Sequence, residues 1–531
     1  MNKQLTIFLF LLACLHISSA FGQLYLPLNA YYQNEVERQF LTDSASTLSN
    51  AHLSMKPILD KRTNAENIYQ SQGKHYYWIT QKIFKENFIV FEGADFWCSI
   101  DPILDLELGS DFSADSLERL YWNTRGIRIQ GKFFDQVGFS TVIYENQAIL
   151  PLYQRTYADD HGEFFPNSIL TQYQQNNAII PGYARTKPFK TNGYDFGFAE
   201  GYVHYSPSKH FNIQLGNGNH FIGNGYRSLL LSDFTTNYPF LKLETNLWED
   251  RIQYNTIYAL HQNPYRLVLY TTPEATYERK IGTYHYLDFA ISKNLQIGLF
   301  EGNQWRLVDS LGSHQPNYLF LNPVPFVSSL IKQNDSTGFS SIMGINLSGS
   351  IGSLNAYTQL LVSNGGIGGY QLGLKYYNLF IPQLDLAVEY NQVLRGAYLN
   401  ENARYNYSHN NLPIAHPFVN DFQELVVRLD YQHNRFFIRN SLNYSQRIYQ
   451  DSIPVYNTIL APLTDIEGES SHRGIFLYNQ LEIGYRFNKR NNLQVYLGHL
   501  YRNQNSPADN PLTNYAYIGV RTELKNKYRD Y

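Results

Sequence analysis

The sequence predicts an all-β fold: a transmembrane antiparallel β-barrel of about 18 strands with a short N-terminal helical segment. Apolar and polar residues alternate along the chain from about residue 97 onward, as they do in strands whose two faces differ. Short and long connections between these strands also alternate. The chain holds 45 tyrosines and 33 phenylalanines but only 16% charged residues, which suits a barrel with aromatic girdles at both membrane interfaces.

Residues 1–22 have the pattern of a secretory signal peptide. Lys3 is followed by a short apolar core and then by small residues, with cleavage expected after Gly22 or Ala20. The alternative is a lipoprotein signal ending at Cys14, but the apolar core before this cysteine is very short. Downstream, no apolar run approaches the roughly 20 residues of a membrane-spanning helix. A mature protein that enters a membrane must therefore do so as a barrel.

Residues 23–96 form an N-terminal segment with a different pattern. Tyr32, Val36, Phe40 and Leu41 recur at helical spacing, with charged and amide residues between them. We expect one or two short helices here, on the periplasmic side and beside the mouth of the barrel. They form either a small helical subdomain or a plug for the barrel.

The predicted barrel covers residues 97–531, and its strands have one apolar and one polar face. Leu425 and Leu429 share one face of a strand, whereas Glu424 and Arg428 share the other. In a membrane barrel the apolar face contacts lipid and the polar face lines the lumen. A soluble β-sandwich would alternate as well, so the connections between strands must distinguish the two folds.

These connections fall into two length classes. Tight turns are predicted near residues 131–134, 206–209, 248–251, 292–294, 350–352, 380–383, 432–435 and 488–492. Longer stretches alternate with them at residues 148–195, 217–237, 263–280, 303–339, 394–420, 450–474 and 503–513, and only the connection at 364–370 is short. Outer-membrane barrels place short turns in the periplasm and long loops outside. The asymmetry favours a barrel in the outer membrane, with a last strand ending near Leu524 and "KNKYRDY" after it.

The glycine-rich stretch "GNGNHFIGNGYRSLLLSD", residues 216–233, is the main candidate site. It lacks the lysine of a phosphate-binding loop, and no crossover helix follows it. An enzyme would pair His220 with Ser228 and Asp233, but proximity in sequence is weak evidence for a triad. In the structural interpretation the glycines let the loop pass close to the barrel wall, and Arg227 pairs with Asp233 inside it.

A third interpretation is that this loop offers hydrogen bonds and ring faces to a sugar chain. The polysaccharide-binding or loop-organising candidates are Asn219, His220, Asn224, Tyr226, Arg227 and Asp233. We expect no catalytic residue, and therefore no enzyme. The polar loop at residues 400–418 is rich in Asn, Tyr and His, which also suits sugar binding.

Other ligands have less support. Asp159, Asp160, His161 and Glu163 lie close enough in sequence to hold a divalent cation, but an exposed acidic loop is the commoner explanation. We expect neither a metal nor a cofactor. The formal net charge of −3, with acidic and basic residues interleaved, offers no cationic surface to nucleic acid.

Three features together resemble the Wzi family of capsule assembly proteins. They are the segment "SNAHLSMKPI", the predicted barrel and the sequence "GNGYRSLLLSD" at residues 223–233. Within that family the chain looks closest to the RemB-like branch associated with gliding motility. The resemblance implies a lectin-like barrel that attaches or organises exported surface polysaccharide, and in the gliding branch a contribution to cell-surface motility. Its partners would be outer-membrane lipid, surface polysaccharide and the motility machinery.

The polar face of the strands also fits a different class of function. A porin or solute channel would line its lumen with the same charged and amide side chains. A plugged barrel should pass little current and a channel should pass much more, so conductance separates the two hypotheses.

Overall fold

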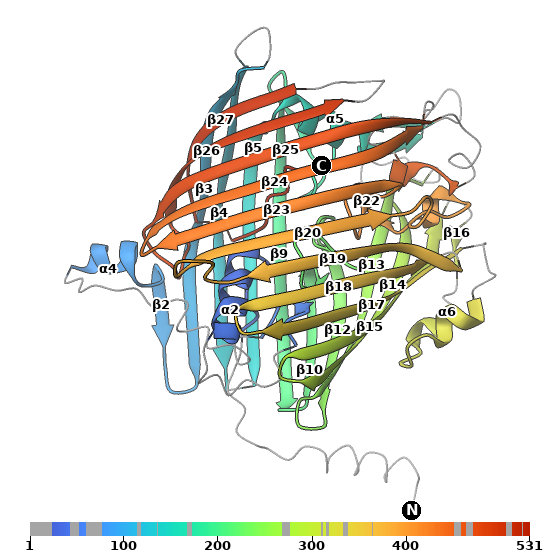
Figure 1. Ribbon diagram of the computed structural model, residues 1–531, viewed down its shortest axis with the longest axis horizontal. Coiled ribbons are helices and arrows are strands. Elements are labelled where there is room, and N and C mark those ends of the chain that lie inside the picture. The colour runs from blue at the N-terminus through green and yellow to red at the C-terminus, as the bar shows by residue number, and fades with distance from the viewer. Residues whose placement is uncertain are drawn as a thin grey trace, which may run out of the picture.

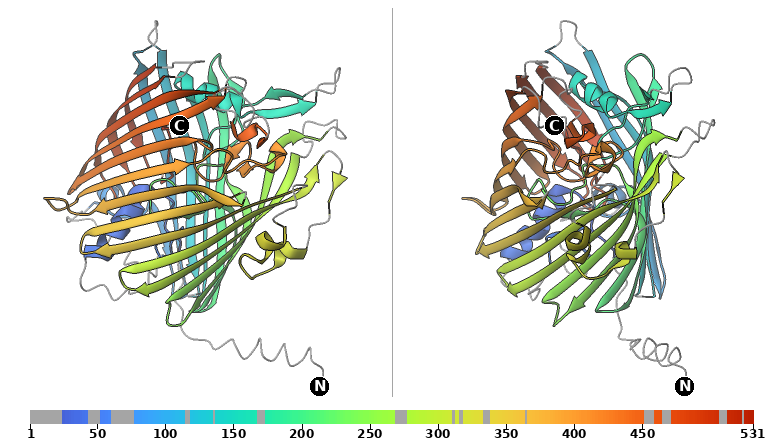
Figure 2. Two further views of the ribbon diagram at one scale, coloured as in Figure 1. Left: turned by 45° about the vertical axis from the view of Figure 1, so that its right-hand side comes forward. Right: turned by 90° about the vertical axis from the view of Figure 1, so that its right-hand side faces the viewer.

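The computed structural model describes residues 24–42, 52–59, 77–113, 118–134, 136–166, 173–267, 277–309, 312–314, 318–332, 338–363, 365–450, 458–463, 471–505, 512–522 and 524–531. The predicted signal peptide, residues 1–22, lies outside this part of the chain. Within the described residues, 18 long strands form a closed antiparallel barrel (Figures 1 and 2). The first of them, β3, pairs with the last, β27, and this pairing closes the sheet. The predicted fold class is therefore confirmed.

In chain order, the barrel strands are β3 (Phe96–Asp111), β4 (Glu118–Phe133), β5 (Val137–Ile149), β9 (Gly193–Ser208), β10 (Phe211–Gly218), β12 (Tyr238–Leu247), β13 (Ile252–Arg266), β14 (Tyr277–Ser292), β15 (Leu295–Asp309), β17 (Phe339–Ile351), β18 (Leu354–Ser363), β19 (Gly366–Tyr376), β20 (Leu384–Val393), β23 (Phe422–His433), β24 (Phe436–Gln450), β25 (Ser471–Arg486), β26 (Gln494–Asn505) and β27 (Leu512–Arg521).

The shorter elements lie before the barrel and in its connections. The short strands are β1 (Met55–Lys56), β2 (Ile89–Glu92), β6 (Glu163–Pro166), β7 (Tyr173–Asn176), β8 (Lys187–Phe189), β11 (Phe221–Ile222), β16 (Gly312–Ser313), β21 (Ser408–His409) and β22 (Leu412–Pro413). The helices are α2 (Ala30–Thr42), α4 (Trp78–Phe84), α5 (Leu152–Asp160) and α6 (Val327–Lys332), with 3-10 turns η2 (Tyr318–Leu321), η3 (Ala403–Tyr405) and η4 (Thr458–Leu460). Among the described residues, none of the helices has the length and hydropathy to cross a membrane.

The alternation of short turns and long loops agrees with the prediction. Strands β9 and β10 are joined by residues 209–210, for example, whereas residues 394–421 separate β20 from β23. The connection between β18 and β19 is short, as expected. The connection between β3 and β4, residues 112–117, is short as well, which the sequence pattern did not indicate. The stretch at 503–513, predicted to be long, is a short connection too, residues 506–511 between β26 and β27. By the usual threading of such barrels, the turn side is periplasmic and the loop side is outside.

The two faces of the strands are those that the alternation predicts. Leu425 and Leu429 on β23 remain 40% and 37% exposed on the outer surface, as lipid-facing side chains do. Glu424 on the same strand is 1% exposed and points into the barrel. A carboxylate as deeply buried as that of Glu424 needs polar partners inside the barrel.

Helix α2 fills the periplasmic end of the lumen. Its Arg38 binds Asp385 at the start of β20 at 2.8 Å, and its Glu37 contacts Lys56 at 3.3 Å and Lys375 on β19. Burial raises the pKa of Glu37, but the two lysines outweigh burial and hold this pKa at about 2. Figure 1 shows α2 within the barrel outline. Of the two predicted arrangements, the helix therefore has that of a plug.

The chain after β27 also enters the lumen. Strand β27 ends at Arg521, three residues before the predicted end at Leu524. Residues 524–531, hereafter the inward segment, then turn into the barrel, where Tyr531 is 3% exposed (Figures 1 and 2). Lysine and arginine side chains of this segment bind carboxylates on β3: Lys527 binds Asp105, and Arg529 binds both oxygens of Glu107 at 2.7 Å. These contacts hold the inward segment against the inner face of β3.

Candidate functional site

Most of the glycine-rich stretch, from residue 219 onward, lies in the connection between β10 and β12, residues 219–237, hereafter the lumenal loop, and residues 216–218 end β10. It is folded into the barrel, and its Leu229, Leu230 and Leu231 have no exposed surface. Strand β11 of this loop pairs with β1 of the N-terminal segment. Together with α2 and the inward segment, the lumenal loop forms the lumenal plug.

The glycines of this loop permit close approach to the wall, as predicted. Gly223 has a φ of 139°, and a Cβ atom there would lie 2.4 Å from the side-chain amide nitrogen of Gln359. A Cβ atom on Gly225 would lie 2.2 Å from a carboxylate oxygen of Glu389. Glycine is the residue that tolerates both the positive φ and the lack of space.

Gly225→Ala is therefore expected to loosen the lumenal loop. The added methyl group would displace the Glu389 carboxylate, which accepts hydrogen bonds from the Tyr226 backbone and the Tyr357 hydroxyl. We expect a loss of about 1–3 kcal/mol in the free energy of unfolding, measured by urea denaturation in detergent. Gly197→Ala is the control, because nothing lies within 4 Å of its added Cβ atom. Equal effects of the two substitutions would contradict the assignment.

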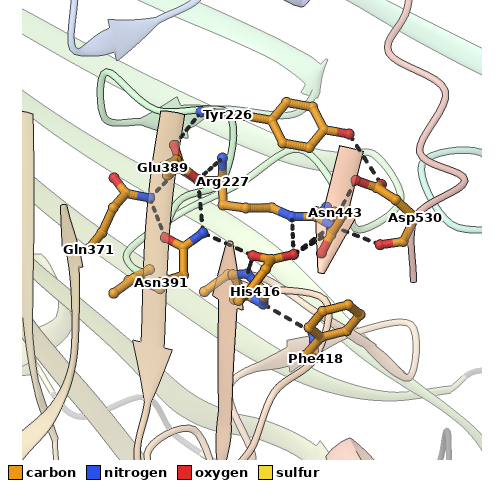
Figure 3. Close-up of polar contacts among 12 residues, drawn as sticks. Tyr226, Arg227, Gln371, Glu389, Asn391, His416, Phe418, Asn443 and Asp530 are labelled. Carbon is orange, nitrogen blue, oxygen red and sulfur yellow. Dashed lines mark hydrogen bonds and ion pairs between the residues drawn. The ribbon is translucent and has the colours of Figure 1, made fainter. Parts of the chain in front are cut away.

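Arg227 is the centre of the polar contacts in Figure 3. Its guanidinium lies 3.2 Å from Glu424 on β23 and 2.9 Å from Asp530 of the inward segment. Its backbone N–H donates to Glu389 at 3.1 Å. Burial lowers the pKa of Arg227, but the charges of Asp530 and Glu424 outweigh it and raise that pKa above its usual value. Arg227 therefore joins the lumenal loop to the wall and to the inward segment.

The predicted pairing of Arg227 with Asp233 is wrong. Asp233 instead accepts hydrogen bonds from the Asn526 amide at 2.9 Å and from the Tyr528 hydroxyl. Both partners belong to the inward segment, which supplies Asp530 to Arg227 as well. The physical reason is that the inward segment supplies polar partners to Arg227 and to Asp233 separately, so the two side chains do not have to pair with each other.

The remaining predicted residues organise the lumenal loop through local contacts. The Asn219 amide donates to the Thr235 carbonyl at 2.8 Å, and the Asn224 carbonyl accepts from the Asn346 amide at 3.1 Å. Tyr226 donates its hydroxyl to Asp530 at 3.1 Å. These contacts support the loop-organising role, whereas the sugar-binding role stays a prediction.

The side chains of the hypothetical triad have separate partners. The Ser228 hydroxyl donates to the Ile222 carbonyl at 2.6 Å, and a ring nitrogen of His220 lies 3.2 Å from the Tyr238 hydroxyl. Asp233 binds the inward segment. A nucleophile–base–acid triad requires hydrogen bonds among its members. The side-chain hydrogen bonds given above instead join these three residues to other groups.

The acidic cluster at residues 159–163 is also divided. Asp159 accepts from the Tyr194 hydroxyl at 2.9 Å, and a ring nitrogen of His161 contacts the Tyr157 carbonyl at 2.8 Å. Glu163 is buried and pairs with two arginines. In the described part of the chain, no group of three or more His, Cys, Asp or Glu side chains is placed to hold a metal ion.

Several residues in or around the lumenal plug were not among the predicted candidates. His416 lies 2.7 Å from Glu424, and Asn443 donates to the same carboxylate (Figure 3). The sequence did indicate that Glu424 lies inside the barrel, because the alternation places it on the lumenal face of its strand. No comparable signal identified Asp530 of the inward segment.

A cavity of about 400 Å³ lies beside the lumenal plug. It is bounded by β4, β5, β9 and β10 and by residues 24–28, and three predicted residues line it: Asn219, His220 and Asp233. Three residues of this lining each have a buried polar atom with no hydrogen-bond partner among the described residues: the side-chain oxygens of Gln214 and Asn219, and one ring nitrogen of His220. Burial lowers the pKa of His220 well below its usual value, so its ring is neutral.

Aromatic side chains complete this lining. Trp97, Phe198 and Tyr202 border the cavity together with these polar residues. Amide oxygens and imidazole nitrogens can bind hydroxyl groups, and aromatic faces can pack against an apolar ring face. Such a mixture of ring faces and a few convergent polar groups is typical of small-molecule sites.

Comparisons with known proteins show the fold. No family model matches the chain, and neither does any curated protein sequence. Among solved structures, it is similar to Wzi, an outer-membrane protein involved in group 1 capsule assembly in Escherichia coli and described as a carbohydrate-binding β-barrel. That match has a TM-score of 0.53 at 11% identity and covers 94% of this chain and 99% of Wzi.

Two further structures are more distant. OccAB4 of Acinetobacter baumannii matches with a TM-score of 0.42 at 9% identity, covering 81% of this chain and 98% of its own. OccK2 of Pseudomonas aeruginosa, solved with glucuronate, matches with a TM-score of 0.43 at 9% identity, covering 80% and 97%. The likeness to Wzi, together with the closed barrel, shows that the chain has the fold of an outer-membrane β-barrel.

Proposed function

We propose that this protein is a non-enzymatic outer-membrane barrel that binds carbohydrate, with surface polysaccharide as its ligand. The observation that carries the proposal is the lumenal cavity, whose lining combines aromatic residues with Gln214, Asn219 and His220, each of which has an unpartnered buried polar atom. Sugars present hydroxyl groups and apolar ring faces, which match both parts of this lining. The likeness to Wzi, itself described as carbohydrate-binding, supports the same proposal. A contribution to gliding motility, in a RemB-like branch, is the finer role that the sequence resemblance adds.

The alternative function is a porin or solute channel. The polar lumenal face favours it, but the lumen is occupied by α2, by the lumenal loop and by the inward segment. Their buried ion pairs, such as Arg227 with Glu424, favour a lumen that stays closed. In planar bilayers we expect the purified protein to pass little current, whereas steady high conductance would favour the channel.

Carbohydrate binding is tested by isothermal titration of the purified protein with the surface polysaccharide of its own source cells. Gln214→Leu removes an unpartnered carbonyl oxygen from the cavity while keeping the size of the side chain. We expect at least about tenfold weaker binding, equivalent to about 1.4 kcal/mol.

The matched control is Gln423→Leu, which makes the same change at an exposed position on the outer surface of β23. It should bind as the unchanged protein does. No binding by any of the three proteins would refute the proposed function, and equal binding by all three would refute the cavity as its site.

A further inference from the structure

The outer surface of the barrel carries a polar patch in the middle of neighbouring strands. Glu301 is the seventh of the 15 residues of β15, and it pairs across the sheet with His285, the ninth of the 16 residues of β14. Both lie on the outer face: Leu295, which shares its side of β15 with Glu301, is 37% exposed, whereas Tyr286, next to His285, binds Ser54 inside the lumen. A bare carboxylate at this depth would face lipid hydrocarbon, which is unfavourable.

A segment of the connection between β15 and β17 covers this patch. Residues 318–332, which contain η2 and α6, hereafter the outer clasp, fold back along the outside of the wall (Figures 1 and 2). The backbone N–H groups of Phe326 and Ser329 donate to Glu301, the second at 3.0 Å, and the Ser329 hydroxyl binds Glu301 and Asn303. Glu301 is thereby fully buried.

Two further contacts hold the outer clasp against the wall. The Tyr254 hydroxyl contacts the Pro323 carbonyl and lies 2.7 Å from a ring nitrogen of His285. Leu319 packs into an apolar cluster with Trp305 and Phe339 of the wall. The inner side of the outer clasp is therefore polar over the polar patch and apolar beside it.

The opposite side of the outer clasp is apolar and exposed. Its most exposed large apolar side chains are Tyr318, Leu321, Val324, Leu330 and Ile331, each at least 53% exposed. In water such a surface would be unfavourable, whereas against acyl chains it replaces the lipid-facing side chains that the patch lacks.

We propose that the outer clasp lies within the outer leaflet of the membrane, between the barrel wall and the lipid acyl chains, and that Glu301 fastens it there. The sequence pattern placed residues 303–339 among the external loops. The described part of this connection instead completes the lipid-facing surface of the barrel. This proposal does not depend on carbohydrate binding.

The proposal is tested by spin labelling. Leu330→Cys is made in a Cys98→Ser background, labelled with a nitroxide and reconstituted in liposomes, and its collision rates with oxygen and with a water-soluble nickel chelate are measured. We expect the oxygen-rich, nickel-poor profile of lipid, equal to that of a label at Leu442→Cys on the outer face of β24, where the native side chain is 36% exposed. A label at Lys187→Cys, exposed in the loop-side strand β8, provides the aqueous reference.

Two outcomes would overturn this assignment. A nickel-accessible label at position 330 would place the outer clasp in water. A label accessible to neither collider would place it against protein, such as a second copy of the chain.

The fastening role of Glu301 has its own variant. Glu301→Leu removes the acceptor for Phe326 and Ser329, and the label at position 330 should gain mobility by at least a factor of two in rotational rate. Gln423→Leu, elsewhere on the outer surface, should leave the mobility unchanged. Unchanged mobility in Glu301→Leu would refute the fastening role, and the collision measurement on the unmodified wall remains decisive if this variant does not fold.

Discussion

Arg227→Met should destabilise the folded barrel by about 3–5 kcal/mol, because it leaves two carboxylates buried without their shared partner. Arg227 is 2% exposed, and its guanidinium contacts both Glu424 and Asp530. Methionine retains much of the side-chain volume, so the loss of stability comes mainly from removal of the positive charge. The free energy of unfolding is measured by tryptophan fluorescence in urea, with the protein in detergent micelles.

The control is Arg395→Met, which breaks the ion pair of Arg395 with Asp421. The two side chains of that pair are 39% and 25% exposed, so solvent screens their interaction and we expect a loss below about 1 kcal/mol. Equal losses in the free energy of unfolding for the two substitutions would show that the buried contacts of Arg227 do not stabilise the lumenal plug.

A chain shortened to end at Thr522 should conduct ions where the full chain does not. The deletion removes the inward segment, and with it one or more partners of each of Asp105, Glu107, Arg227 and Asp233. Those side chains would then be hydrated, and water would enter the space that the segment occupied. Single-channel recording in planar bilayers measures the current, and heat-shifted migration on gels shows that the barrel has formed.

The matched variant is Tyr528→Phe, which keeps the inward segment and removes only the hydroxyl that binds Asp233. It should pass as little current as the full chain. A shortened chain that folds and still passes no more current would show that the inward segment does not close the lumen.

The barrel could be predicted from sequence because its rules are local. Whether Leu425 faces lipid and Glu424 faces the lumen follows from alternation along one strand, and the length of each connection is read from a few residues. The plug-forming role of α2 was one of two alternatives, because the helical spacing of Tyr32 and Val36 shows a helix but not the surface that receives it.

The contacts of the lumenal plug depend on residues far apart in the chain. Arg227 was among the predicted candidates, but its partner was assigned to Asp233, six positions away. Its actual partners, Glu424 and Asp530, are 197 and 303 positions away. Only closure of the barrel brings these three residues together, so no local sequence pattern predicts the contact.

The outer clasp shows the same limit on the outside of the wall. Alternation places His285 and Glu301 on the lipid side, and this departure from an apolar face could have been noticed. It would have indicated that something covers the patch. It would not have indicated Ser329, because the covering segment has no strand periodicity of its own.

The lumenal plug is drawn from parts of the chain that come before, between and after the barrel strands. It can be complete only once β3 and β27 have met, because the inward segment directly follows β27 and binds carboxylates on β3. We therefore expect closure of the wall and sealing of the lumen to be a single late event in assembly. A barrel arrested before that event would leave an open pore in the outer membrane. We therefore expect such an intermediate to be short-lived in the cell, either completed or degraded.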